Sequence, residues 1–293
     1  MRVVSDRPRP GAIPAELPPA ERDLFAALGG GPATFVAERP DVVFFDRLYL
    51  IEEAAGSQFD ALCARGREGL GIPGSLVTVA MTGRGFHGHR QRGWATLRGN
   101  LHLSATFSPA GRPASDALGL VMLPALAAVD AVRELSGGRL APGIKWVNDI
   151  LVDGRKVAGV LTATSSREDH LESVVLGIGL DVERTPDVPP TPFVPAVACL
   201  RDFAGCGTVR LATAIEALVG ALGRRAATVV AEGAAALFPE YREFSLVRGR
   251  RARVLSEEGV LLAEGVVEDV LPDLRLRFEG GGEPVDRGRL VLV

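Results

Sequence analysis

The sequence is poor in cysteine, lysine and aromatic residues. Its three cysteines, Cys63, Cys199 and Cys206, have no metal-ligand spacing and leave an odd count, which favours reduced, buried thiols in a cytosol over a disulfide framework. The net charge of −3 argues against general nucleic-acid binding. We see no charged-then-apolar leader and no apolar run of bilayer length, so we expect a cytoplasmic protein with no membrane partner.

One segment predicts a hairpin that carries several polar residues. It begins Lys145-Trp146-Val147-Asn148-Asp149-Ile150 and turns at Asp153-Gly154, a pair that adopts the positive φ of a tight turn at low cost. Lys156 follows the turn. Lysines on a rigid hairpin are well placed to hold a phosphate or carboxylate, and Asp149 is suited to a metal or a hydrogen-bond network. An ordinary amphipathic hairpin with solvated lysines is the alternative.

A second segment predicts a glycine-rich basic loop. It reads Thr82-Gly83-Arg84-Gly85-Phe86-His87-Gly88-His89-Arg90-Gln91-Arg92-Gly93-Trp94, and a strand-like stretch from Gly99 to Ser104 follows it. The glycines let main-chain N–H groups approach an anion, the arginines add positive charge, and Trp94 offers a flat face for a base. The loop is neither a Walker A motif nor a dinucleotide-binding motif, because no Gly-Lys-Ser/Thr and no helix follow. A basic surface loop is the alternative.

Together, and in this order, the two segments resemble the catalytic core of biotin–protein ligases. That family typically shows G-R-G-R-R-G-R followed by Trp, a G-x-N-L-x-x-S strand, K-W-P-N-D, G-K-K-x-x-G and a glycine-rich G-x-G-x-N strand. The chain keeps a specific subset of these residues, namely Gly83-Arg84-Gly85, Gly88, Trp94, Asn100-Leu101, Ser104, Lys145-Trp146, Asn148-Asp149, Lys156, Ala158-Gly159, Gly177 and Gly179. The resemblance spans residues 41–293.

The resemblance implies an ATP-dependent ligase that adenylates biotin and transfers it to a lysine of a biotin carboxyl carrier protein. Such an enzyme aligns the acid with the α-phosphate and neutralises charge. It implies ATP and Mg²⁺ as cofactors and biotin as substrate, and it leaves a homodimer open. Some members carry an N-terminal DNA-binding domain, but the residues before the core offer no recognition helix, so we expect no DNA binding.

The motif match also implies roles for individual residues. Lys156 and Arg84 would be catalytic, and Asp149 would contact Mg²⁺. The acid would be bound by Gly83, Arg84, Gly85, Gly88 and Gly159, and the nucleotide by Trp94, Asn148, Asp149, Lys156, Arg90 and Arg92.

The departures from the family fall mainly on the side that reads the acid. Leu50, Ile51 and Glu52 stand where the family has Ser-Thr-Asn, and Ala80 stands where it has Gln. Four further changes are Phe86 for the second loop arginine, extra loop residues that include Arg90 and Arg92, Val147 for the proline and Asp181 for the closing Asn.

These changes keep two alternatives open: the same mechanism on another acid such as lipoate or octanoate, and a non-catalytic nucleotide or acid binder. A zinc site at His87, His89 and His102 has no fourth ligand or standard spacing, and Ser104 has no visible base partner.

For the fold, the resemblance implies an α+β catalytic domain of the class II aminoacyl-tRNA synthetase and biotin ligase type, with a central mixed sheet covered by helices. A small antiparallel β-barrel would follow. We expect a Pro-rich extension over residues 1–40, irregular over 1–19, a ligase domain over 41–240 and the barrel over 241–293. Patterning predicts strands at 42–45 and 76–80, helices at 52–65, 116–135 (kinked or divided at Pro124) and 211–232, irregular backbone at 185–195, and C-terminal strands at 251–254, 261–267, 274–278 and 290–293.

Overall fold

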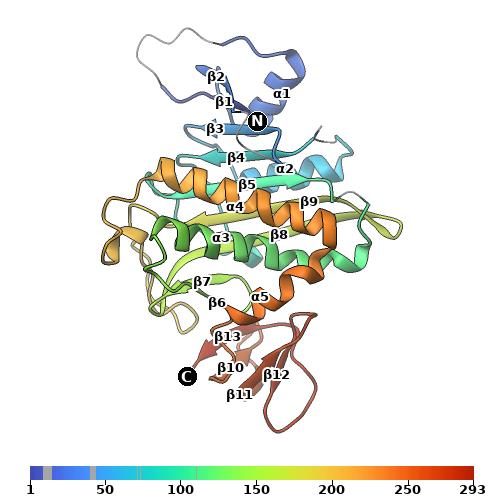
Figure 1. The fold of residues 1–293 in the computed structure, drawn as a ribbon, viewed down its shortest axis with the longest axis vertical. Helices are drawn as coiled ribbons and strands as arrows, with labels where there is room; N and C mark the ends of the chain where they lie inside the picture. Colours follow the sequence, from blue (N-terminus) through green and yellow to red (C-terminus); the bar gives the residue numbers. More distant parts are fainter. Residues whose placement is uncertain (9–14, 40–43, 71, 73, 110) are drawn as a thin grey trace.

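The computed structural model describes residues 1–8, 15–39, 44–70, 72, 74–109 and 111–293. Its largest element is a nine-stranded mixed sheet, in which β1 pairs in parallel with β3 and β3 with β4, while the other pairs are antiparallel. In spatial order the strands are β2 (Phe35–Glu38), β1 (Arg2–Ser5), β3 (Arg47–Ile51), β4 (Leu76–Ala80), β5 (Leu101–Phe107), β9 (His170–Leu180), β8 (Arg155–Arg167), β7 (Asp149–Val152) and β6 (Gly143–Lys145) (Figure 1).

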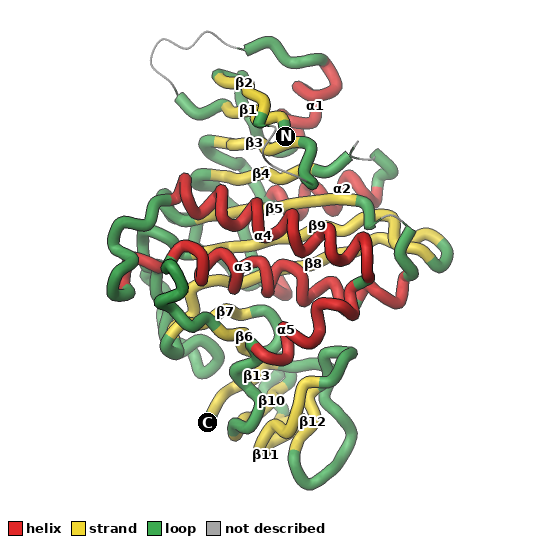
Figure 2. Tube along the Cα trace, viewed as in Figure 1, coloured by secondary structure: helices red, strands yellow, loops and turns green. Residues whose placement is uncertain are grey.

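Helices cover both faces of this sheet and divide the core in two. Two long helices, α3 (Met122–Leu135) and α4 (Leu211–Glu232), lie side by side across one face (Figure 2). The smaller core on the other face contains residues of α1 (Pro19–Ala27) and α2 (Gln58–Arg67). The shorter helices are α5 (Phe238–Glu243) and the 3₁₀ turns η1 (His89–Gln91), η2 (Ala114–Ala117), η3 (Gly119–Val121), η4 (Leu200–Asp202) and η5 (Ala234–Leu237).

Strand β5 shows how the sequence separates core from site. Leu101, Leu103 and Ala105 belong to the larger core beside α3 and α4. His102 and Ser104 alternate with them and therefore point to the opposite face. β5 thus presents apolar residues to the long helices and polar residues to the side on which α2 packs.

Several sequence predictions are confirmed. The helix over 211–232 is α4, the strand over 76–80 is β4, and the Asp153-Gly154 turn joins β7 to β8 with positive φ at both residues. Residues 185–195 carry no regular secondary structure. The mixed α+β class is also confirmed.

Two predictions for the apolar stretch before β6 are wrong. Pro124 neither kinks nor divides a helix, because α3 begins at Met122 and Pro124 lies in its first turn, where a missing N–H costs no helical hydrogen bond. Ala114–Leu135 is also long and apolar enough to pass for a membrane span, contrary to our expectation. Of its most apolar window, 61% is buried inside the protein, as in a core helix.

The N-terminal part also differs from prediction. Residues 1–19 are not wholly irregular, because β1 pairs with β2 and β3. Residues 42 and 43 of the strand predicted at 42–45 lie outside the described part of the chain, and β3 begins later, at Arg47. The helix predicted from residue 52 begins at Gln58, where the Ser57 side chain accepts a hydrogen bond from the N–H of Asp60.

The C-terminal residues form a separate antiparallel sheet below the main one (Figure 1). Its order is β12 (Leu276–Phe278), β11 (Leu261–Val270), β10 (Arg251–Leu255) and β13 (Arg289–Leu292). The predicted strands are present, but closure into a barrel is not confirmed. The division at residues 40 and 240 stays a prediction, and β1 and β2 of the proposed extension pair with the main sheet.

The packing of α3 against both the sheet and α4 yields a stability prediction. Leu126 is fully buried, so Leu126→Ala should lower the free energy of unfolding by about 2–5 kcal/mol through lost burial and a residual cavity. Leu261 is 52% exposed, and Leu261→Ala should change stability by less than about 0.5 kcal/mol. Urea denaturation of both variants measures the difference, and equal losses would contradict the assignment of the core.

Candidate functional site

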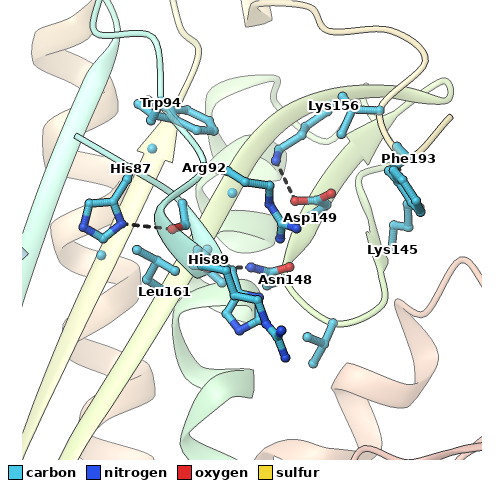
Figure 3. Close-up of a pocket in the computed structure, with 18 of the residues that line it drawn as sticks. His87, His89, Arg92, Trp94, Lys145, Asn148, Asp149, Lys156, Leu161 and Phe193 are labelled. Atoms are coloured by element: carbon cyan, nitrogen blue, oxygen red, sulfur yellow. Dashed lines mark hydrogen bonds and ion pairs between the residues drawn. The ribbon is translucent and has the colours of Figure 1, made fainter. Parts of the chain in front are cut away.

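A large cleft of about 770 Å³ lies where the glycine-rich loop, strands β5, β8 and β9, the Lys145–Asp149 turn and the C-terminal sheet meet (Figure 3). It brings together most of the residues singled out from the sequence. The predicted site residues that line it are Gly88, Arg90, Arg92, Trp94, Asn148, Asp149, Lys156 and Gly159.

The floor of the cleft is a row of cross-strand neighbours. Gly159 of β8 faces Gly179 of β9, which faces His102 of β5. The indole of Trp94 lies over the two glycines. A Cβ on Gly179 would lie 2.3 Å from Cε2 of Trp94, and one on Gly159 would lie 3.3 Å from Cζ3. The ring can rest on the sheet only because both positions lack side chains.

This close approach predicts the effect of one methyl group. Gly179→Ala should push the Trp94 ring off the sheet and lower the free energy of unfolding by about 1–3 kcal/mol. The difference in fluorescence emission between variant and wild type would report the displaced indole. Gly207→Ala is the control, because a Cβ there meets nothing within 4 Å. An unchanged emission spectrum in Gly179→Ala would show that Trp94 does not lie where we place it.

Lys156 has two neighbours in the cleft. Its Nζ lies 2.6 Å from Oδ1 of Asp149 and 5.4 Å from the centre of the Trp94 ring. Both side chains of the ion pair are about one-fifth exposed, so the charges face the cleft and are only partly screened by water. Asn148 braces this corner, because its Nδ2 donates to the backbone oxygen of Val160 at 2.8 Å.

Lys145 is the only other lysine of the sequence, and it lines the same cleft. It is 6% exposed and donates a hydrogen bond to the backbone oxygen of Phe193. Burial lowers the pKa of Lys145, and repulsion from Lys156 and Arg289 acts in the same direction against the attraction of Asp149. An anion bound here would stabilise both ammonium groups.

Two arginines of the glycine-rich loop form ion pairs with a turn of the C-terminal sheet. Arg90 and Arg92 lie 3.6 and 3.5 Å from the carboxylate of Glu257, which belongs to the turn between β10 and β11. All three side chains line the cleft. Because the arginines are about half exposed, these ion pairs contribute little to stability, and an anion in the cleft can compete for them.

Three predicted residues do not line the cleft. The side chain of Arg84 is 84% exposed and lies 3.8 Å from Glu53 on the protein surface. Gly83 and Gly85 flank it. A Cβ on Gly83 would lie 2.6 Å from the Phe86 ring and 2.7 Å from the backbone oxygen of Ala54, so Gly83 allows the loop to pack. The roles of Gly83, Arg84 and Gly85 at the acid or phosphate stay predictions that this placement does not favour.

The residues expected to read the acid are also placed elsewhere. Ile51 and Ala80 are fully buried in the smaller core, and Glu52 pairs with Arg98 at 2.6 Å. Ser57 and Phe59, from the start of α2, line the cleft instead. Our sequence reading missed them because it placed the helix too early. The available signal was Ser57 as a helix-capping residue, with the side chains of the first turn directed toward the sheet.

Asp181 lies at the end of β9, inside the cleft and 2% exposed. Its Oδ1 accepts a hydrogen bond from Nδ2 of Asn100 at 2.8 Å. Burial raises the pKa of Asp181 to about 8, although Lys156 and the Asn100 hydrogen bond oppose the shift. At neutral pH this carboxyl group is therefore largely protonated and can donate as well as accept.

The shifted acid predicts how stability depends on pH. Since burial raises the pKa of Asp181 from its ordinary 3.8 to about 8, the folded state loses stability as pH rises from the lower of these values to the higher. Asp181→Asn should remove this loss, so its stability advantage over wild type should grow between pH 5 and pH 9 in urea denaturation. Asp187→Asn, at an exposed position, is the control. Parallel pH curves for Asp181→Asn and wild type would contradict the raised pKa.

The histidines do not gather around one point. His87 Nε2 lies 2.8 Å from Asp60; burial lowers its pKa, but hydrogen bonds with the Gly88 carbonyl and Asp60 outweigh burial and raise the pKa overall. Burial and neighbouring arginines lower the pKa of His89. Within the described ranges no group of three His, Cys, Asp or Glu residues is arranged to hold a metal ion.

The sequence is similar to those of known ligases. A family model for the biotin/lipoate A/B protein ligases matches residues 73–181. The chain is 31% identical over 237 residues to a biotin--[acetyl-CoA-carboxylase] ligase of Mycobacterium tuberculosis, which covers 78% of this chain and 82% of that protein. It is 32% identical over 134 residues to the bifunctional ligase/repressor BirA of Bacillus subtilis, but it spans only 40% of that relative's length.

The fold is similar to that of solved proteins as well. The biotin protein ligase from Aquifex aeolicus, solved in complex with biotin and ATP, superposes with a TM-score of 0.63 at 17% identity. The superposition covers 85% of this chain and 99% of that one. At this identity, the likeness shows a shared fold.

Proposed function

Because the chain belongs to the biotin/lipoate A/B protein ligase family, we propose that it adenylates biotin with ATP and transfers the biotinyl group to a lysine of a biotin carboxyl carrier protein. The proposal rests on the cleft as well as on membership of this family. Cations, a flat aromatic ring and neighbouring glycines of the sheet converge there at a size suited to a nucleotide and a small acid.

The observation that carries the proposal is the position of Lys156. Its ammonium lines the cleft, 5.4 Å from the centre of the Trp94 ring and 2.6 Å from Oδ1 of Asp149. Joining a carboxylate to the α-phosphate of ATP brings two anions together, so the reaction needs a fixed cation between them. Lys156 is held on the rigid β7–β8 hairpin, which makes it suited to this role.

In this reaction the protein aligns the reacting groups and forms no covalent bond with the substrate. A carboxylate oxygen of biotin attacks the α-phosphorus, a P–O bond forms, and pyrophosphate leaves. The amine of the carrier lysine then attacks the acyl carbon, an amide forms, AMP leaves, and the amine loses a proton. Lys156 neutralises the oxygens in both steps.

Further residues take supporting roles in this proposal. Trp94 packs against adenine, and Arg90 and Arg92 leave Glu257 to bind phosphate oxygens. Asn148 positions the turn, and Gly88 and Gly159 let the loop and sheet approach the acid. Asp149 suits Mg²⁺ as one carboxylate ligand, because such an ion takes its remaining ligands from phosphates and water.

One observation favours a second acid. Phe59 packs within contact distance of Gly177, where a Cβ would meet its ring at 3.1 Å, and Phe86 and Leu161 line the same end of the cleft. An apolar end of this kind also suits lipoate or octanoate with the same mechanism. A non-catalytic binder is the outcome left if no acid is turned over.

We further propose a cytoplasmic location, no binding of nucleic acid, and a ligase domain over residues 41–240 followed by a small C-terminal domain, in the family's form a β-barrel. The net charge of −3 supports the second of these. The C-terminal domain contributes Glu257 and Arg289 to the cleft. A homodimer stays a prediction.

The test is pyrophosphate release with Mg-ATP and biotin, lipoate or octanoate. Wild type should respond to biotin, and Lys156→Ala should lower the rate by about a hundredfold or more because a preorganised cation is lost. Arg167→Ala is the matched control, since Arg167 is an exposed cation of the same strand, paired with Glu172. Unchanged turnover in Lys156→Ala would refute our placement of the chemistry.

A further inference from the structure

His102 is a buried residue of the cleft that the chemistry described so far does not use. It lies on β5, is 2% exposed, and lines the cleft beside Ser104. Its neighbours across the ladder are Ala80 on one side and Gly179 on the other, both without a polar side chain. Among these three neighbouring positions, the imidazole is therefore the one polar side chain.

The hydrogen bonding of the ring defines its tautomer. Nε2 of His102 lies 3.4 Å from the backbone oxygen of Leu97, and a carbonyl oxygen only accepts, so Nε2 carries the proton. Burial lowers the pKa of His102 to about 4, so the ring is neutral at physiological pH. Nδ1 is consequently a bare acceptor.

The part of the protein that the structure describes leaves this acceptor unsatisfied. Nδ1 of His102 is buried and has no hydrogen-bond partner among the described residues. The indole N–H of Trp94, over neighbouring Gly179, is also buried without such a partner, so it does not serve Nδ1. A buried acceptor without a donor is costly, and a bound ligand that offers a donor would recover that cost.

The surroundings narrow the class of ligand. The ring of Phe86 lies 5.7 Å from the imidazole, centre to centre, and Phe59 and Leu161 line the same end of the cleft. A ligand group that reaches Nδ1 must shift the side chains that cover it, lie among apolar walls and donate one hydrogen bond. An N–H on a compact ring does this, whereas an alkyl chain or a dithiolane does not.

We propose that His102 is a specificity-determining residue whose Nδ1 accepts a hydrogen bond from an N–H of the acid substrate, so that the cleft selects cyclic ureas such as biotin over lipoate and octanoate. This inference rests on the proposed function, because it takes the cleft to be the acid site. His102 would then be the polar residue that recognises the acid in this chain, in place of residues 50–52 and 80, where the family has polar side chains.

The experiment measures dissociation constants of biotin, desthiobiotin, lipoate and octanoate by calorimetry. His102→Phe keeps a ring but removes the acceptor. It should weaken biotin and desthiobiotin roughly ten- to a hundredfold, while lipoate and octanoate bind unchanged or tighter. His102→Gln, which restores an acceptor oxygen, should recover part of the loss for the two ureas. Equal weakening of all four acids would overturn the proposal.

A second measurement uses wild-type protein and does not depend on the variants folding. In ¹⁵N-histidine-labelled protein, the resonance of the His102 Nδ1 should move on addition of biotin and stay in place with octanoate. A resonance unmoved by bound biotin would overturn the role of Nδ1. The proposed function fails separately, if no acid supports pyrophosphate release; turnover of biotin with unaltered selectivity in His102→Phe would sink only the inference about His102.

Discussion

The register of three antiparallel strands is the constraint on which the rest of the site depends. β5, β9 and β8 place His102, Gly179 and Gly159 in one row, and the next row holds Ser104, Gly177 and Leu161. A shift of one residue in either ladder would turn these side chains toward α3 and α4. The apolar alternation of β5 against the long helices prevents that shift, so the larger core fixes the geometry of the cleft.

Charge in the cleft is arranged around carboxylates that an anionic ligand can replace. Lys156 pairs with Asp149, and Arg90 and Arg92 pair with Glu257 from a different part of the chain. Each pair keeps its cation in place in the cleft. Because the groups are partly exposed, the cation stays charged and can bind an anionic ligand. Phosphate oxygens entering the cleft would meet side chains that are already positioned, which lowers the cost of ordering them.

The sequence predicted the elements that have strong local signals. Apolar periodicity gave α4 its limits, and the Asp153-Gly154 turn located the hairpin that carries Asp149 and Lys156. The motif match predicted that Trp94, Asn148 and Lys156 belong to one site, and all three line the cleft. One prediction failed where contacts between distant parts of the chain decide the structure: β1 forms because it pairs with β3 in the sheet. Another failed at a local signal, because α2 begins after the helix cap Ser57, which the sequence prediction did not use. Arg84 matched a motif but its side chain points to solvent, which no spacing rule reveals.

In the proposed function, one cleft activates a biotin-like acid and passes it to a lysine of another protein. The most direct test is the intact mass of a purified biotin carboxyl carrier domain after incubation with this protein, Mg-ATP and biotin. We predict a gain of one biotinyl group on a single lysine, dependent on ATP and absent with Lys156→Ala. A carrier of unchanged mass, with biotin and ATP both bound by the folded protein, would contradict the claim.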